Sequence, residues 1–145
     1  MFRWLLNRAK DKPLAITHDV VALTSGTRVL RIRVSGYYPP GCSGSSHARQ
    51  IYETGAKTLR ATNADALLLD FSDLDYVWGD DLLMAFDIPW HESIERENCP
   101  TAVIVGPKCR EALESLIYDW RNTDLLFRDE ASALEQISRD AHNRA

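Results

Sequence analysis

One continuous stretch, from Ala66 to Phe86, restricts what this chain can fold into more than any other part of it. Its first residues, Ala66-Leu67-Leu68-Leu69, are apolar at every position. A strand without a polar face has to be buried on both sides, as a central strand is in a sheet covered by helices on both faces. The stretch therefore predicts an α/β fold with this strand in the middle of the sheet.

A strongly acidic turn follows the strand. Its aspartates lie within twelve residues, at Asp70, Asp73, Asp75, Asp80 and Asp81. We call the segment from Asp70 to Asp81 the acidic turn. Its last two carboxylates fall where the next helix begins, where they can accept free backbone N–H groups and complement the helix dipole. Because sites in open α/β sheets form at the carboxyl ends of the strands, this turn is the first candidate for a site.

The rest of the sequence alternates strands with helices. A hairpin is predicted from Leu14–Leu23 and Thr27–Val34, which are rich in β-branched residues and flank Thr24-Ser25-Gly26. A loop over Ser35–Ser45 then leads into a helix over His47–Thr62. We expect Ser45 or Ser46 to cap the start of that helix and Asn63 to end it.

Four more elements are predicted after the acidic turn. Pro89 should kink or break the first of them near Asp87, and Asp129 should cap the last. In order, they are a helix over Asp81–Asn98, a strand over Thr101–Val105, a helix over Pro107–Trp120, and a strand over Leu125–Phe127 followed by a helix from Glu130 to about Asn143. The order β-β-α-β-α-β-α-β-α favours parallel strands with right-handed crossovers.

Length, charge and cysteine spacing limit the class of protein. The 145 residues suffice for one domain, 13–145, preceded by an amphipathic segment, 1–12, that packs on this domain or on another chain. The net charge of −4 argues against a nucleic-acid surface. No apolar run approaches the roughly 20 residues of a membrane span or resembles a signal peptide, so we expect a cytoplasmic protein. Zinc and disulfide spacings are missing among Cys42, Cys99 and Cys109, and we expect no cofactor.

Several motifs resemble those of the STAS domain, the module shared by sulfate transporters and anti-sigma-factor antagonists. Leu67-Leu68-Leu69-Asp70 is similar to the family's buried strand with an acidic end, and Asp73–Val77 to the turn after it. Trp78-Gly79-Asp80-Asp81-Leu82 occupies the family's Asp-Ser-Ser-Gly-Leu region. The likeness, which runs over Leu14–Ala141, is completed by Ala102–Pro107, Leu126–Asp129 and Ala131–Ile137. It implies a mostly parallel sheet of about five strands with four to five helices, and a regulatory role through protein binding.

The chain departs from this family at a residue central to its regulation. In the family a phosphorylatable serine or threonine starts the helix after the turn, and Asp80 takes its position here. Trp78 stands where the family has an acidic residue, and no serine or threonine occurs between Asp73 and Ile88. The resemblance implies that phosphorylation does not switch this turn. Asp80 would supply a permanent charge, without the extra charge and third oxygen of a phosphate.

Three interpretations of the acidic turn are open. Clustered carboxylates suit Mg²⁺, and Asp73–Val77 matches the DxDx[TV] pattern of haloacid-dehalogenase-like phosphatases, although the chain is too short for that family's other motifs. The aspartates can also be solvated helix caps, or part of a surface that binds a protein. The Tyr37-Tyr38 loop follows a strand and should lie at the same edge of the sheet. The candidate partner-binding residues are therefore Asp73, Asp75, Trp78, Asp80, Asp81, Tyr37 and Tyr38.

The tryptophans divide into two groups. Trp78 either folds back onto the core or is exposed as an anchor for a partner. Trp90 and Trp120 are expected to cover the edges of the core.

These observations predict a non-enzymatic bacterial regulatory module that docks on a partner protein with a basic surface and occludes it. Acidic residues would speed the encounter, and aromatic residues would supply affinity. One alternative is an immunity protein that neutralises a bacterial toxin, since many toxins have basic clefts. The other is a small metal-dependent hydrolase that uses the Asp73–Asp81 turn. A neighbouring toxin gene would favour immunity, and a sigma-regulator kinase or transporter gene would favour signalling.

Overall fold

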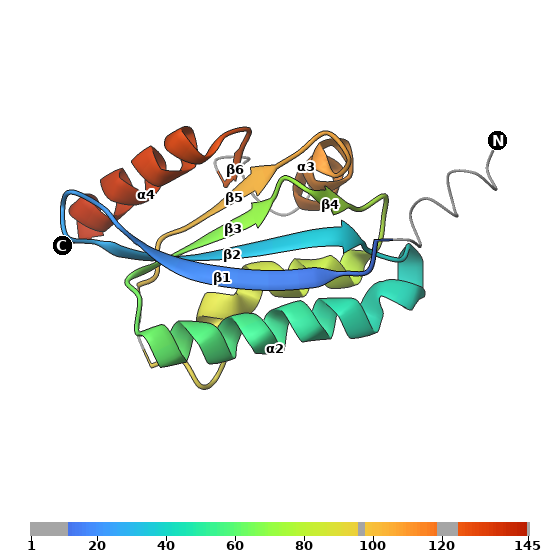
Figure 1. Ribbon diagram of the computed structural model, residues 1–145, viewed down its shortest axis with the longest axis horizontal. Coiled ribbons are helices and arrows are strands. Elements are labelled where there is room, and N and C mark those ends of the chain that lie inside the picture. The colour runs from blue at the N-terminus through green and yellow to red at the C-terminus, as the bar shows by residue number, and fades with distance from the viewer. Residues whose placement is uncertain (1–11, 96–97, 119–124, 145) are drawn as a thin grey trace.

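The part of the chain that the structure describes forms a six-stranded sheet (Figure 1). The structure is a computed structural model that describes residues 12–95, 98–118 and 125–144. Across the sheet the strands are β1 (Ala15–Ala22), β2 (Arg28–Tyr37), β3 (Ala66–Phe71), β5 (Thr101–Val105) and β6 (Leu126–Phe127), and the short β4 (Leu74–Asp75) pairs with the end of β2. β1 is antiparallel to β2, and the other pairs are parallel. The predicted α/β class and mostly parallel sheet are confirmed.

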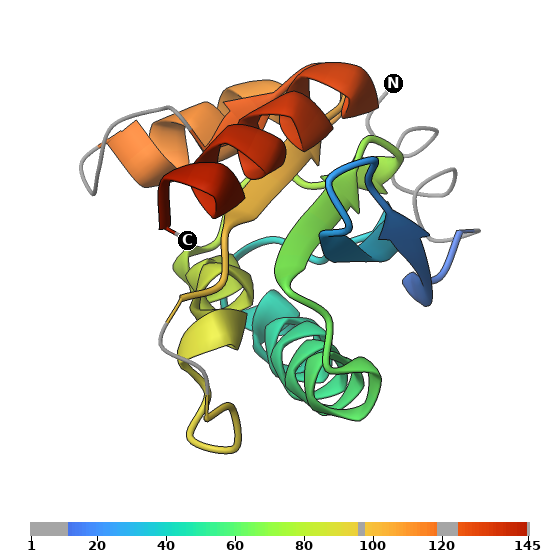
Figure 2. The same cartoon turned by 90° about the vertical axis from the view of Figure 1, so that its left-hand side faces the viewer.

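Helices cover both faces of the sheet (Figure 2). On one face lie α2 (Ser45–Thr62), preceded by the short 3₁₀ helix η1 (Gly41–Gly44), and the longer 3₁₀ helix η2 (Asp80–Trp90). On the other face lies α4 (Glu130–Arg144), and α3 (Arg110–Tyr118) adds Leu113 to the cluster on the α2 side. Along β3, Leu67 and Leu69 join the α2-side cluster and Leu68 joins the α4-side cluster. β3 is therefore the doubly covered central strand that its apolar sequence predicted.

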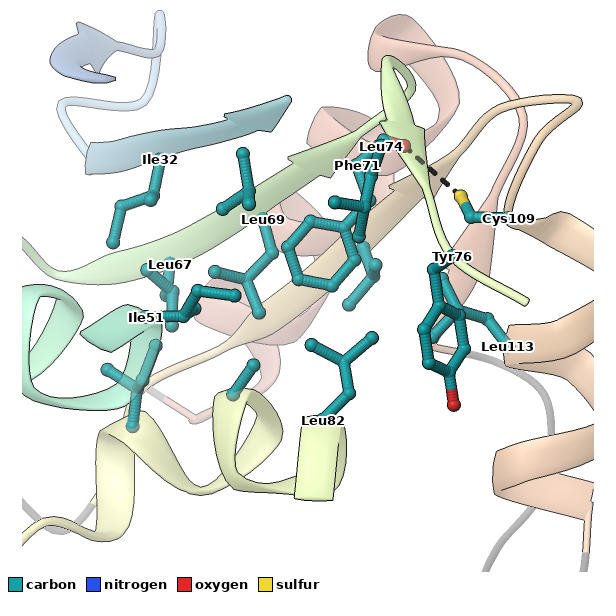
Figure 3. Packing of buried hydrophobic residues seen from close by; sticks show 14 of the residues in the cluster. Ile32, Ile51, Leu67, Leu69, Phe71, Leu74, Tyr76, Leu82, Cys109 and Leu113 are labelled. Atoms are coloured by element: carbon teal, nitrogen blue, oxygen red, sulfur yellow. Dashed lines mark hydrogen bonds between the residues drawn. The ribbon is translucent and has the colours of Figure 1, made fainter. Parts of the chain in front are cut away.

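The larger cluster fills the space between the sheet and the two helices α2 and η2 (Figure 3). Ile32, Leu67 and Phe71 point from the strands toward Ile51 of α2 and Leu82 of η2, and each is at most 1% exposed. Burying one such side chain contributes roughly 1.5–3 kcal/mol relative to leaving it in water. The core thus fixes the positions of the strand ends and of the helix that follows the acidic turn.

The helix after the acidic turn differs from the prediction in length and geometry. We expected a helix over Asp81–Asn98, but the structure has a 3₁₀ helix that ends at Trp90. Its buried residues recur at every third position: Leu82, Ala85 and Ile88. That spacing matches the three residues per turn of a 3₁₀ helix rather than the 3.6 of an α-helix. The predicted break near Asp87 is wrong: the helix runs through Pro89, which has no N–H to donate, and ends at Trp90.

Other boundaries also move. β2 extends three residues beyond the predicted Val34, because its end pairs with β4, so the first part of the expected loop is strand. α2 begins at Ser45 with Gly44 as its N-cap, in place of Ser45 or Ser46. α3 begins at Arg110 rather than at Pro107. The predicted end of that helix at Trp120, and residues 1–11 of the N-terminal segment, lie outside the described residues.

Two predicted helix ends are confirmed. Asn63 ends α2 in the left-handed conformation, with φ of 48°, which asparagine tolerates better than most residues. Asp129 caps α4, because its carboxylate accepts the backbone N–H of Ser132 at 2.7 Å. In the part of the chain that the structure describes, no helix has the length and apolar character that crossing a membrane requires.

Candidate functional site

Backbone hydrogen bonds hold the loop after β2 against the acidic turn. Gly36 N–H donates to Asp73 O at 3.2 Å, and Tyr38 N–H donates to Asp75 O at 3.0 Å. Further along, Gly41 N–H donates to Trp78 O at 3.2 Å. The two segments predicted to share the carboxyl edge of the sheet therefore lie side by side.

The aspartates of the turn have different surroundings. Asp70 is half-buried and accepts the backbone N–H and the hydroxyl of Ser72 at 3.0 and 2.6 Å, and it lies 3.5 Å from Arg33 Nε. Asp81 accepts a hydrogen bond from the Ser45 hydroxyl at the start of α2, so it ties η2 to that helix. This position also sets its negative charge near the positive end of the α2 dipole. Asp70 and Asp81 therefore have structural roles in addition to their charge.

The other three aspartates differ in exposure. Asp73 and Asp80 are exposed, and Asp75 is half-buried. Asp80 is in the first turn of η2. The carboxyl edge thus carries a negative charge that does not depend on modification.

Trp78 is exposed, which decides between the two alternatives that its sequence position allowed. Its side chain is 61% exposed, and that of Val77 is 63% exposed. The Trp78 ring lies over Gly41, where an added Cβ would come within 2.6 Å of Trp78 Cη2. One side of the ring therefore packs against Gly41, and much of the rest of its apolar surface is in contact with water. Val77 was not among the predicted site residues, although it directly precedes Trp78.

Tyr38 does not belong to the surface, and this candidate was wrong. It is fully buried, and its ring meets that of Tyr76 edge to face, with centroids 5.3 Å apart. Burial, and to a lesser extent the negative charge of Asp81, raises the pKa of Tyr38 to about 12. Tyr76 donates its hydroxyl to Gly79 O at 2.8 Å, and burial is the main cause of its raised pKa (Figure 3 shows this ring beside Leu113). Both rings belong to the larger core cluster.

Tyr37, in contrast, is half-buried and lines a hollow of about 660 Å³ beside the turn. Asp73 and Asp75 line one part of this hollow, and Lys12 and Lys108 line another. The hollow therefore has balanced charge, and the net negative charge lies toward η2. We call Tyr37, Asp73, Asp75, Val77, Trp78, Asp80 and Asp81 together the carboxyl-edge surface.

Trp90 contradicts its predicted role of covering the core. It is 74% exposed at the far end of η2, next to the turn that Pro89 causes. Trp120 lies outside the described residues. Trp90 is thus the second exposed tryptophan among the described residues, at the opposite end of η2 from Trp78.

In the part of the chain that the structure describes, metal-ligating groups do not gather at this edge. Within residues 12–95, 98–118 and 125–144, no three His, Cys, Asp or Glu side chains are placed to hold a metal ion. Cys109 is buried, its thiol donates to Phe71 O at 3.1 Å, and burial raises its pKa to about 11 (Figure 3). A thiol with a raised pKa is a poor nucleophile at neutral pH.

Comparison with known proteins gives a likeness of fold. Neither a family model nor a curated protein matches the chain. Among solved structures, an anti-sigma factor antagonist from Mycobacterium paratuberculosis matches with a TM-score of 0.53 and 19% identity, over 86% of this chain and 95% of that chain. A protein of the DUF3478 family with a SpoIIAA-like fold, from Shewanella loihica, gives 0.49 and 15% over 86% and 95% of the two chains. Unphosphorylated SpoIIAA, an anti-sigma factor antagonist, gives 0.45 and 13% over 86% and 96%.

The chain therefore has a STAS-like fold, as its motifs predicted. At this level of identity the likeness defines the arrangement of strands and helices. The function has to be argued from the side chains of the carboxyl-edge surface.

Proposed function

We propose that this chain is a non-enzymatic regulatory module of the bacterial cytoplasm that docks on a partner protein and occludes part of its surface. The observation that carries the proposal is the exposure of Trp78 and Val77 at the carboxyl edge. Large aromatic side chains that lose their water at the centre of an interface supply much of its binding energy. Because the Trp78 ring already rests on Gly41, docking would cost little additional side-chain entropy.

The charges around Trp78 favour a partner with a basic surface. Asp73 and Asp80 are exposed on the same edge, and Asp81 adds its charge from the start of η2. Carboxylates around an apolar anchor attract a positive surface during encounter and disfavour an acidic one. Trp78 would therefore contribute mainly to affinity, and the aspartates mainly to the association rate.

A solved structure with the same fold supports a regulatory role, because that protein is an anti-sigma factor antagonist. In this chain Asp80 takes the place of the family's phosphorylated residue, and we propose that its charge is permanent. The module would bind its partner at all times, or its switch would lie outside the acidic turn.

Affinity capture from the native cell, with two matched tryptophan variants, tests this proposal. Trp78→Ala should lose the captured partner, because removing a central aromatic anchor costs about 2 kcal/mol or more, roughly a thirtyfold weaker Kd. Trp90→Ala is the control, since it removes an equally large exposed side chain at the other end of η2. A partner that Trp78→Ala retains, or that Trp90→Ala loses as well, contradicts the proposed surface.

The role of the charges needs a second variant and a kinetic measurement. Asp73→Asn combined with Asp80→Asn should slow association with the purified partner by about tenfold at low salt and leave dissociation nearly unchanged. The difference should shrink as salt rises, because exposed charges are screened. If the captured protein is a toxin, the module is an immunity protein. Calorimetric titration with Mg²⁺ tests the other alternative: binding heat in the parent chain that disappears in this double variant would favour the metal-dependent hydrolase.

A further inference from the structure

The outer edge of β1 is the longest free strand edge that the structure describes. β1 pairs with β2 along its whole length, and no described segment pairs with its other side. Six of its eight side chains are exposed, and Ile16 and Val21 are half-buried. In Figure 1 this strand forms the border of the sheet, and α2 is drawn below it. A free strand edge presents a row of backbone donors and acceptors that can pair with another strand.

The hairpin turn shows which backbone groups of β1 point outward. Leu23 N–H donates to Thr27 O at 2.9 Å, so the N–H of Leu23 points toward β2. In an antiparallel pair the residues alternate, and each second residue directs both its N–H and its C=O to the same side. Counting back from Leu23, the residues that direct these groups to the free edge are Ala22, Val20, His18 and Ile16.

β1 also lacks the features that usually protect an edge strand from pairing. Its sequence, AITHDVVA, contains no proline, glycine or lysine. Its register with β2 runs one residue to one residue from Ala15 to Ala22, so no bulge bends it away. Its acidic residue, Asp19, is paired with Arg31 of β2 and thus does not offer an isolated charge. The edge is straight, regular and nearly neutral, which favours pairing with another strand.

We propose that this edge binds β1 of a second copy of the chain, forming a two-fold dimer with one continuous sheet. A two-fold axis that relates antiparallel strands of one sheet is perpendicular to the sheet, so the side chains of opposed residues point to the same face. The residue numbers of an opposed pair therefore differ by an even number. As a result, one residue of each copy lies opposite itself at the axis. The side chains select His18 as that residue.

With His18 opposite His18 of the second copy, the remaining positions match in character. Ile16 lies opposite Val20 of the second copy, and Thr17 lies opposite Asp19. The Val20 side chain is 37% exposed in a single chain, and this pairing would cover it in both copies of the dimer. The next allowed register puts Asp19 opposite Asp19, where like charges are destabilising. Of these two registers, the one with His18 at the axis covers apolar side chains and separates the carboxylates.

The dimer leaves the carboxyl-edge surface free. β1 is antiparallel to β2, and the axis reverses the whole sheet, so the two copies present their carboxyl edges at opposite ends. This inference does not depend on the proposed function. If both hold, the dimer offers two partner sites and binds a clustered partner more tightly than a single copy does.

A disulfide at the axis tests the register directly on the full-length chain. In a background with Cys42→Ser and Cys99→Ser, His18→Cys should form a disulfide-linked dimer under mild oxidation. The two Cα atoms of such a hydrogen-bonded pair lie about 5.5 Å apart, within the range of a disulfide. Thr17→Cys and Asp19→Cys are the matched controls and should not cross-link to themselves. Cross-linking of Asp19→Cys, or equal cross-linking of all three variants, overturns the proposed pairing.

Light scattering across a dilution series tests the dimer without cross-linking. The parent chain should have twice the mass of one copy at high concentration and dissociate on dilution. Val20→Pro removes one outward N–H while leaving the bonds to β2 in place, and an edge strand tolerates proline there. It should be a monomer with the circular dichroism spectrum of the parent. A parent that is a monomer at every concentration, or a dimer that survives Val20→Pro, refutes the inference.

Discussion

The two buried tyrosines of the larger core cluster offer a sharp test of how the structure is held together. Tyr38 and Tyr76 are at most 2% exposed and lie edge to face. Tyr76 donates its hydroxyl to Gly79 O at 2.8 Å, whereas the Tyr38 hydroxyl has no hydrogen-bond partner among the described residues. Replacing either tyrosine by phenylalanine removes one hydroxyl oxygen from a buried ring of the same cluster. The two substitutions should nevertheless change the free energy of unfolding in opposite directions.

The magnitudes follow from the hydrogen bonds. Tyr76→Phe loses a neutral hydrogen bond, which contributes about 0.5–1.5 kcal/mol, and leaves Gly79 O without that donor. Tyr38→Phe removes a polar group whose burial without a partner costs about 1–3 kcal/mol. We therefore expect Tyr76→Phe to be less stable than the parent by about 1 kcal/mol and Tyr38→Phe to be more stable by about 1 kcal/mol.

Urea denaturation followed by far-ultraviolet circular dichroism measures this difference. The slope of the free energy against urea should stay constant, because neither substitution changes the surface exposed on unfolding. The midpoints should move apart by an amount that corresponds to about 2 kcal/mol. If Tyr38→Phe is destabilised as much as Tyr76→Phe, the Tyr38 hydroxyl is hydrogen-bonded in solution and the argument is wrong.

Two further predictions use the same unfolding measurement. Gly106→Ala should lower the free energy of unfolding by about 3 kcal/mol or more, because the added Cβ would lie 1.9 Å from the backbone Ser72 O. Gly26→Ala should lower it by only about 1 kcal/mol, because Gly26 has a φ of +91° but no atom within 4 Å of the added Cβ. Equal losses would contradict the steric argument. Burial raises the pKa of Tyr38 from 10.0 to about 12, so the folded state keeps a proton that the unfolded state loses, and the free energy of unfolding should fall as the pH rises from 10 toward 12. Tyr38→Phe should therefore lose less stability than the parent between pH 10 and 12, and parallel losses would refute this assignment.

The sequence predicted those parts of the fold whose environment leaves a local pattern. Burial on both faces leaves an unbroken apolar run, which is why Ala66–Leu69 could be placed in the middle of the sheet. The left-handed end of α2 at Asn63 and the cap of α4 at Asp129 depend on the chemistry of one residue and its neighbours. The period of η2 was also present in the sequence, in the spacing of Leu82, Ala85 and Ile88, but it was interpreted as an α-helix.

The parts that could not be predicted depend on contacts between distant segments. Tyr37 and Tyr38 are adjacent and identical. Tyr38 continues the alternation of Ile32 and Val34 into the core cluster, but this alternation can be followed to position 38 only when β2 is known to extend to Tyr37. Trp90 was assigned to the core from the usual behaviour of tryptophan. Its exposure depends on where the chain turns after Pro89, and the sequence contains no direct signal for that direction.

The carboxyl edge shows why the fold and the function of this chain require separate tests. Backbone groups join its segments, as in the bonds from Tyr38 N–H to Asp75 O and from Gly41 N–H to Trp78 O. Such bonds form with almost any side chains, so the edge can keep its shape while its chemistry changes. This accounts for a shared fold at 19% identity with an anti-sigma factor antagonist. Substitutions at the exposed residues Trp78 and Asp80 therefore test the proposed function while leaving the fold intact.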